Sequence, residues 1–187
     1  AEAQSKVVAW ENRGAVAVVT MNNPPVNALG IALRQGLVEA FAAVNADSSV
    51  KAIVVTGTGK AFSAGADITE FSKGRLAPFL PDVINLIEQS PKPVVARVHG
   101  AALGGGAGLV AACDIPVAAL GTQFGFTEVR LGIIPAVISP YVVGKIGESA
   151  ARELFLTGER FEAVRAAEIG LVRAAVPPED LDTAVDG

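Results

Sequence analysis

Two residue types that often mark function are nearly absent: the 187-residue chain has one cysteine, Cys113, and one histidine, His99. A single cysteine cannot form an internal disulfide, which excludes a disulfide-stapled secreted scaffold and favours a reducing compartment. One Cys and one His also supply no recognisable zinc ligand set. We therefore expect Cys113 to be a small buried apolar residue, and we expect no metal cofactor.

Positive charge and long apolar runs are scarce as well. Lys and Arg total 15 against 19 Asp and Glu, a formal net charge of −4, and no basic block could follow a phosphate backbone. The longest stretch without polar side chains, residues 100–113, has fourteen residues, fewer than the roughly 18 to 20 that cross a bilayer. Residues 1–6 lack the pattern of a signal peptide. These patterns predict a cytoplasmic protein with neither nucleic acid nor a membrane as its partner.

The composition that remains is typical of a globular α/β protein. Hydrophobic residues make up 51%, with 20 Gly and 11 Pro. Strand, helix and strand follow one another, which favours a parallel sheet. The periodicity predicts strands at 6–10, 15–20, 52–56, 94–98 and 115–119, and helices at 31–44, 79–87, 107–112, 150–156 and 163–169. We expect one core domain over residues 1–176, and residues 177–187 read as the start of an incomplete helical segment.

Two familiar kinds of catalytic or ligand-binding loop fit the sequence poorly. The glycines of 57–59 follow a strand, but the spacing of residues 54–62 matches neither a dinucleotide fingerprint nor a phosphate loop. A Gly-x-Ser-x-Gly motif is absent. Ser63 or Ser139 paired with His99 stays open as a nucleophile, although a lone His at a strand end is more often structural.

Two runs of small residues offer a more specific site. Ala66 lies in the run 62–68 and Gly105 in the run 100–106, and each could present a backbone amide to a ligand. Two amides that face one oxygen form an oxyanion hole, and a helix that starts at the glycines would add the positive end of its dipole. Close helix packing is the alternative reason for small residues here.

Glu128 is the best candidate for an acid or base. Its apolar neighbours in 124–135 would disfavour the ionised form and move its pKa toward the working range of a general acid-base group. A surface carboxylate paired with Arg130 is the alternative. Asp67 and Asp114 are predicted to be structural, at a turn and at a strand entry respectively.

With these residues in place, the chain resembles the enoyl-CoA hydratase/isomerase (crotonase) family from about Val7 to Val176. The resemblance rests on five motifs, at 23–29, 62–68, 92–106, 113–115 and 124–135. It implies a spiral of ββα repeats that forms two near-perpendicular sheets surrounded by helices, assembled as a trimer or a dimer of trimers. It also implies an acyl-CoA thioester as the substrate, so that coenzyme A enters as part of the substrate and no cofactor is needed.

The resemblance assigns roles residue by residue. Ala66 and Gly105 match the positions whose amides hold the thioester oxygen, and Glu128 matches the second of two family glutamates. The substrate-binding positions implied are Val26, Ala28, Ala64, Asp67, Ile68, Thr69 and Gly108.

The first family glutamate is missing, because Gly108 stands in its place. Hydration by two carboxylates is therefore not expected. The favoured hypothesis is an enoyl-CoA hydratase that uses one glutamate, and the alternatives are a 3-enoyl to 2-enoyl-CoA isomerase and an acyl-CoA binding protein without turnover.

Overall fold

The computed structural model describes residues 7–74 and 76–187. Predictions for residues 1–6, including the expected absence of a signal peptide, lie outside these ranges. The strands are β1 (Val8–Arg13), β2 (Val16–Met21), β3 (Ala52–Gly57), β4 (Val94–Val98), β5 (Ala101–Leu103), β6 (Ile115–Ala119), β7 (Gln123–Gly125), β8 (Arg160–Glu162) and β9 (Ala174–Val176). The helices are α1 (Ile31–Ala46), α2 (Leu80–Glu88), α3 (Gly105–Ala112), α4 (Ser139–Thr157), α5 (Ala163–Glu168) and α6 (Leu181–Asp186), with 3-10 helices η1 (Ile68–Lys73), η2 (Thr127–Leu131) and η3 (Pro178–Asp180).

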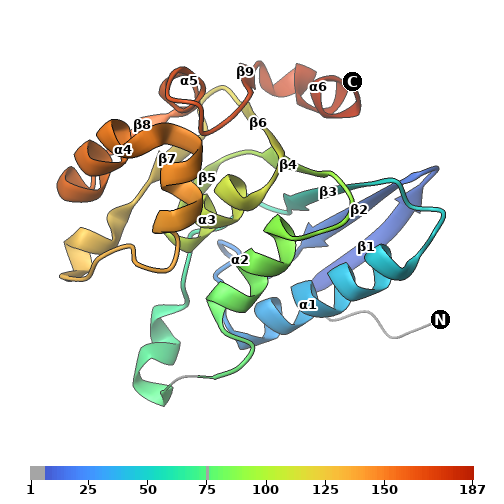
Figure 1. Ribbon diagram of the computed structural model, residues 1–187, viewed down its shortest axis with the longest axis horizontal. Coiled ribbons are helices and arrows are strands. Elements are labelled where there is room, and N and C mark those ends of the chain that lie inside the picture. Colours follow the sequence, from blue (N-terminus) through green and yellow to red (C-terminus); the bar gives the residue numbers. More distant parts are fainter. Residues whose placement is uncertain (1–6, 75) are drawn as a thin grey trace.

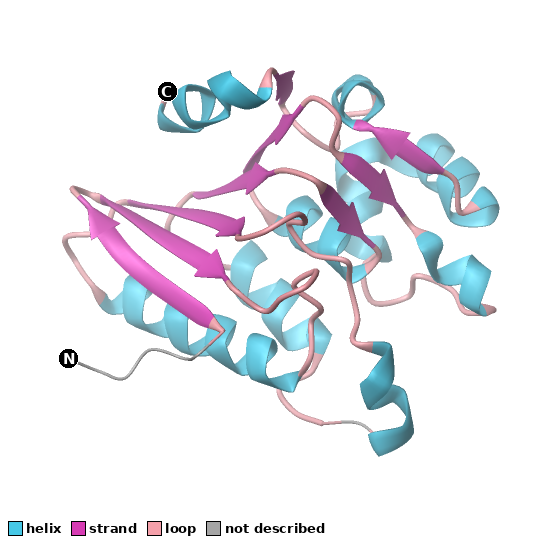
Figure 2. Cartoon of the chain, turned by 180° about the vertical axis from the view of Figure 1, so that it is seen from behind, coloured by secondary structure: helices cyan, strands magenta, loops and turns pink. Residues whose placement is uncertain are grey.

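These elements form two β-sheets with helices around them (Figures 1 and 2). The larger sheet has the strand order β1-β2-β3-β4-β6-β9, and the smaller has the order β5-β7-β8. Only the β1–β2 pair of the larger sheet is antiparallel, and the remaining pairs are parallel as predicted. The chain therefore has the predicted mixed α/β architecture, with α1 and α2 packed along one side of the larger sheet.

Most predicted elements are present with shifted ends. The first strand runs to Arg13 instead of ending at residue 10, because the hairpin turn uses Gly14, with φ of +62°, and Ala15. Helix α3 begins at Gly105, two residues before the predicted start. Helix α4 begins at Ser139 rather than at residue 150 and is interrupted at Gly147, where φ is +76°.

The core lies between the larger sheet and α1, α2 and α3. Cys113 is buried there, its thiol 3.2 Å from the Leu109 carbonyl oxygen, and burial raises its pKa to about 12. The interpretation of Cys113 as a small buried residue is thus confirmed. No helix in the described ranges is both long and apolar enough to traverse a bilayer.

Both aspartates that were predicted to be structural have structural roles. The Asp67 carboxylate caps η1 by accepting hydrogen bonds from the Thr69 hydroxyl at 2.7 Å and amide at 3.0 Å, and these bonds lower its pKa. The Asp114 carboxylate accepts from the Val94 amide at 2.8 Å, where β4 begins.

Candidate functional site

The loop before η1 is held against the start of α3 by backbone hydrogen bonds. The Ser63 amide donates to the Ala101 carbonyl at 3.1 Å, and the Leu103 amide donates back to the Ser63 carbonyl at 3.0 Å. Gly65 has φ of +92°, and a Cβ at that position would lie 2.6 Å from the Leu103 carbonyl oxygen. Only glycine fits such a close backbone approach in this conformation.

The glycines that open α3 serve the same contact. A Cβ on Gly106 would lie 2.2 Å from the Ser63 carbonyl oxygen, and Gly104 has φ of +52°. The close-packing explanation for this run is therefore correct. It is also what brings the two predicted amide-bearing segments together.

Ala66 and Gly105 lie side by side in one cavity of about 330 Å³. The Cβ position of Gly105 is 3.8 Å from the Ala66 amide nitrogen. Gly105 is the first residue of α3, so its N–H has no acceptor within the helix. Within residues 7–74 and 76–187, neither amide donates to another residue. Two unsatisfied amides thus border the same small space.

Glu128 borders the same cavity from η2. Its Oε1 lies 3.3 Å from the position that a Cβ on Gly104 would occupy, one residue from Gly105. Its Oε2 is buried and has no hydrogen-bond partner in the described part of the chain. Burial raises the pKa of Glu128, against a smaller lowering by its own backbone amide. Among the described ion pairs none joins Glu128 to Arg130, so the alternative of a paired surface carboxylate is wrong.

The other predicted substrate-binding residues fall into two groups. Ala64 and Ile68 line the cavity, and Asp67 lines an adjoining cavity of about 350 Å³ that shares Ala66 with it. The remaining predicted positions border neither cavity: Val26, Ala28, Thr69 and Gly108. Sequence reasoning missed Phe71, Leu131 and Ile133, exposed apolar residues of the wall that carry no chemical signature of their own.

Gly108 is covered by Ile138, which follows η2 in the chain. A Cβ on Gly108 would lie 2.3 Å from Ile138 Cγ2, and Ile138 is buried. Because Gly104 and Gly108 are four residues apart, they share one face of α3. Glu128 therefore lies against Gly104 on this face of α3, and Ile138 lies against Gly108 one turn later. A glutamate side chain at position 108 would overlap Ile138 in this packing.

The serine and histidine hypothesis fails on geometry. The Ser63 hydroxyl donates to the Asn27 carbonyl at 2.7 Å, and the Ser139 hydroxyl contacts the Ala136 carbonyl at 3.2 Å. His99 Nε2 lies 2.7 Å from the Gly59 carbonyl oxygen. No bond joins either serine to His99 in the described structure. Nor do the described residues contain a group of three or more His, Cys, Asp or Glu that could hold a metal ion.

A buried arginine fixes η1 at the edge of the site. Arg34 pairs with Glu70 at 3.2 Å, and Glu70 also accepts from the Ile31 amide at 2.8 Å. The same guanidinium donates to the carbonyl oxygens of Leu29, Leu76 and Pro78. Since η1 carries Ile68 and Phe71 of the cavity wall, Arg34 positions that wall.

We expect Arg34→Met to lower the free energy of unfolding by about 3 to 5 kcal/mol, because it leaves the Glu70 carboxylate without its buried partner. Urea unfolding would measure this loss. The matched control is Arg13→Met, whose ion pair with Glu11 is 70% and 61% exposed and is expected to change stability by about 1 kcal/mol or less. Equal effects in the two variants would contradict a structural role for Arg34.

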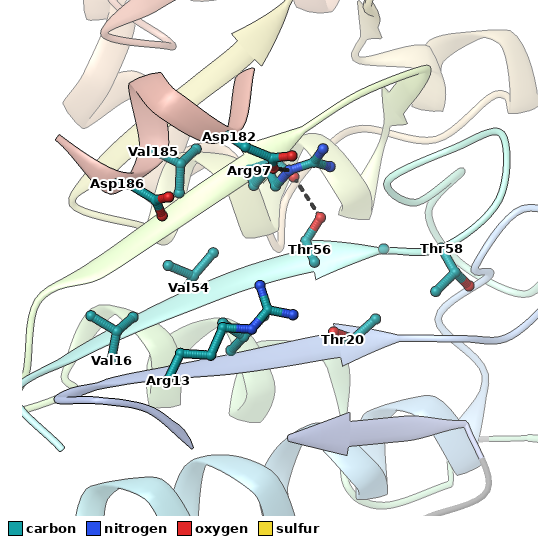
Figure 3. Close-up of a pocket in the computed structure, with 12 residues that line it drawn as sticks. Arg13, Val16, Thr20, Val54, Thr56, Thr58, Arg97, Asp182, Val185 and Asp186 are labelled. Atoms are coloured by element: carbon teal, nitrogen blue, oxygen red, sulfur yellow. Dashed lines mark hydrogen bonds and ion pairs between the residues drawn. The ribbon is translucent and has the colours of Figure 1, made fainter. Parts of the chain in front are cut away.

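A larger cavity, of about 630 Å³, lies elsewhere, on the outer face of the larger sheet beside α6 (Figure 3). Its arginine Arg97 pairs with Asp182 at 2.6 Å, and its carboxylates Asp182 and Asp186 are exposed. This cavity therefore holds no desolvated acid or base. The smaller cavity around Glu128 is the better candidate for chemistry.

Comparisons with known proteins agree with this architecture. The model of the Enoyl-CoA hydratase/isomerase family matches residues 11–185. A Thermus thermophilus protein provisionally named an enoyl-CoA hydratase is 41% identical over 176 residues, which cover 89% of this chain and 70% of that protein. The Short-chain-enoyl-CoA hydratase of Clostridium acetobutylicum is 38% identical over 183 residues, covering 93% and 70% respectively.

A solved structure gives the same result for the fold. The crystal structure of an enoyl-CoA hydratase from Mycobacterium smegmatis superimposes with a TM-score of 0.90 at 33% identity, covering 96% of this chain and 74% of that one. The resemblance stated from the motifs is thereby confirmed, and so is the fold it implies. The chain belongs to the enoyl-CoA hydratase/isomerase (crotonase) family.

Proposed function

We propose that the protein is an enoyl-CoA hydratase that adds water across the 2,3 double bond of an enoyl-CoA thioester. One observation carries the proposal: the unsatisfied amides of Ala66 and Gly105 and the half-buried carboxylate of Glu128 border a single cavity. The names of the relatives support the same reaction class. Coenzyme A is part of the substrate, and the chemistry requires no further cofactor.

In this mechanism the two amides donate to the thioester oxygen. Water adds through its oxygen to C3 while the Glu128 carboxylate takes one of its protons, and the electron pair of the double bond moves toward the thioester oxygen. Amide donors that point at the oxygen stabilise that developing charge. The enolate then takes the proton from Glu128 at C2, which restores the carboxylate.

The alternative is a 3-enoyl to 2-enoyl-CoA isomerase that uses the same two amides and Glu128. Ile138 over Gly108 favours it, because Glu128 then has no second carboxylate to help hold the water. A single carboxylate suffices to remove a proton from C2 and return it at C4.

Incubation with crotonyl-CoA and with but-3-enoyl-CoA distinguishes the candidates. Loss of the conjugated enoyl absorbance from crotonyl-CoA, with formation of 3-hydroxybutyryl-CoA, is the expected result. Appearance of that absorbance from but-3-enoyl-CoA alone would identify an isomerase. Two unchanged thioesters with measurable binding would identify an acyl-CoA binding protein. Trimeric assembly, a cytoplasmic location and the boundary at residue 176 stay predictions.

A further inference from the structure

Ser63 is a fully buried serine that has no part in the proposed reaction so far. Its hydroxyl donates to the Asn27 carbonyl at 2.7 Å and accepts from the Gly65 amide at 3.2 Å. In the described part of the chain the Gly65 amide has no other acceptor. This hydroxyl therefore links the loop at Asn27 to the backbone one residue before Ala66.

Two peptide planes lead from this bond to the Ala66 N–H. The first carries the Gly65 amide, and the second carries the Gly65 carbonyl, which accepts from the Leu29 amide at 2.8 Å. In a trans peptide the carbonyl and the N–H point to opposite sides, and the bond between Gly65 and Ala66 is trans. The Ala66 N–H therefore points away from the Leu29 amide, and Ala66 lines the cavity of Glu128.

Gly65 is the joint between the two planes. Its φ is +92°, and a glycine does not hold such a torsion by itself because it moves freely between conformations. The hydrogen bonds on its two sides hold it instead, one from the Ser63 hydroxyl and one from the Leu29 amide. The direction of the Ala66 N–H thus depends on both bonds.

The carbonyl that holds the Ser63 hydroxyl is itself fixed. Asn27 is only 1% exposed, and its side-chain amide donates to the carbonyl oxygens of Thr58 at 3.0 Å and Ala61 at 2.9 Å. Its Oδ1 accepts from the Asn23 amide at 2.8 Å. The Ser63 hydroxyl therefore has one well-defined acceptor.

The second amide of the pair is oriented in another way. Gly105 opens α3, and the carbonyl of Gly104 accepts from the Gly108 amide at 3.0 Å, which is the bond of a regular helix. Helix geometry therefore sets the direction of the Gly105 N–H without any side chain. Loss of the Ser63 hydroxyl should disturb only the Ala66 amide.

We propose that Ser63 is a positioning residue, whose hydroxyl orients the Ala66 amide toward the thioester oxygen through the Gly65 amide. The inference goes beyond the proposed function and rests on it, because it requires a thioester in the cavity of Glu128. An amide stabilises the developing negative charge only when its N–H points at the oxygen. A turned peptide plane loses that contribution although the chain stays folded.

The first test removes the hydroxyl with Ser63→Ala. We expect kcat for crotonyl-CoA to fall by about 10- to 100-fold, as for a misplaced donor. Binding of butyryl-CoA is expected to stay nearly unchanged, because such a donor acts mainly in the transition state. Steady-state kinetics and calorimetry measure the two quantities, and a wild-type kcat would overturn the proposal.

The matched control is Thr56→Val, which removes another buried hydroxyl. The Thr56 hydroxyl donates to the Arg97 carbonyl at 3.1 Å on the outer face of the larger sheet (Figure 3). Both variants are expected to lower the unfolding midpoint by similar amounts, but the control is expected to keep the wild-type kcat. An equal loss of kcat in the two variants would overturn the proposal in favour of a purely structural role.

Infrared spectroscopy measures the orientation of the amides more directly. The probe is butyryl-CoA, isotope-labelled at the thioester carbonyl, whose stretching frequency falls when the oxygen accepts hydrogen bonds. Wild type is expected to displace this band to lower frequency, and Ser63→Ala to lose about half of the displacement, because one of two donors is turned away. Thr56→Val is expected to keep all of it. An unchanged band in Ser63→Ala would overturn the proposal even if kcat fell.

Ser63→Cys gives the reading if the alanine variant does not fold. A thiol is a weaker donor and acceptor at the same position, so kcat and the band displacement are expected to lie below those of wild type. A fall in kcat without any change of the band would overturn the proposal in this variant too.

The band also separates this proposal from the proposed reaction. If wild type converts neither crotonyl-CoA nor but-3-enoyl-CoA, the proposed function fails, and the bound butyryl-CoA still tests Ser63. A band that is displaced in wild type and shifts back in Ser63→Ala would support the positioning role. A wild-type band at the frequency of the free thioester would overturn it.

Discussion

Glu128→Gln is expected to lower kcat for crotonyl-CoA by about 10²- to 10⁴-fold, the usual contribution of a general acid-base group. The amide is nearly isosteric but cannot accept the proton of the attacking water. Binding of butyryl-CoA, which does not react, is expected to stay nearly unchanged. Steady-state kinetics and calorimetry measure the two quantities.

The control for this variant is Glu159→Gln, an exposed carboxylate outside the cavity, which is expected to keep wild-type kinetics. Wild-type turnover in the Glu128 variant would remove this residue from the mechanism. Loss of butyryl-CoA binding together with turnover would instead point to a disrupted cavity.

The raised pKa of Glu128 contributes to the pH dependence of both activity and stability. As a base, Glu128 works in its ionised form, so the rate is expected to fall as the pH drops through a pKa above the ordinary value of 4.5. The pH dependence of stability has the opposite direction. Between the unfolded and folded pKa values the native state binds more protons, so the wild type loses stability as the pH rises. Glu128→Gln lacks this slope, and denaturant titrations at several pH values would show the difference.

Gly106→Ala is the second variant with a large expected effect. The new methyl group would overlap the Ser63 carbonyl oxygen at 2.2 Å, and that carbonyl is fixed by its bond from the Leu103 amide. We expect a loss of about 3 kcal/mol in the free energy of unfolding, at the upper end for an overpacked site. Because relief would separate Ala66 from Gly105, a fall in kcat of about 10²-fold is also expected.

The control is Gly144→Ala, on the exposed side of α4, where a Cβ has nothing within 4 Å. Alanine there is expected to raise stability by about 0.5 to 1 kcal/mol, since glycine is a poor helix former. If Gly106→Ala kept the unfolding midpoint and the turnover of the wild type, the loop at Ser63 and the start of α3 would not need this close contact.

Elements whose signals are local could be predicted from the sequence. The strands at 94–98 and 115–119 have the predicted bounds, because each is a short, mostly apolar run with a breaking residue within two positions of each end. The first half of α4 was missed, since Pro140, Gly144 and Gly147 obscure its periodicity. The 3-10 helix η1 was missed because the ion pair between Arg34 and Glu70, 36 residues apart, anchors it.

The features of the candidate site can likewise be divided into those that the sequence predicted and those that only the structure shows. Local chemistry singled out Glu128, Ala66 and Gly105, because the residue types themselves carry the signal. What covers Gly108 could not be predicted, since Ile138 is brought over it only by the packing of α3 against α4 and the loop that precedes α4.

The burial of Cys113 has a practical consequence for spectroscopy. With its thiol 1% exposed and no other cysteine in the chain, native protein offers labelling reagents no reactive sulfur. A pair of cysteines introduced at exposed positions such as Lys73 on η1 and Ala136 after η2 would therefore accept spin labels selectively. The distance between those labels, measured with and without a thioester, would test whether the two sides of the cavity move relative to each other on binding.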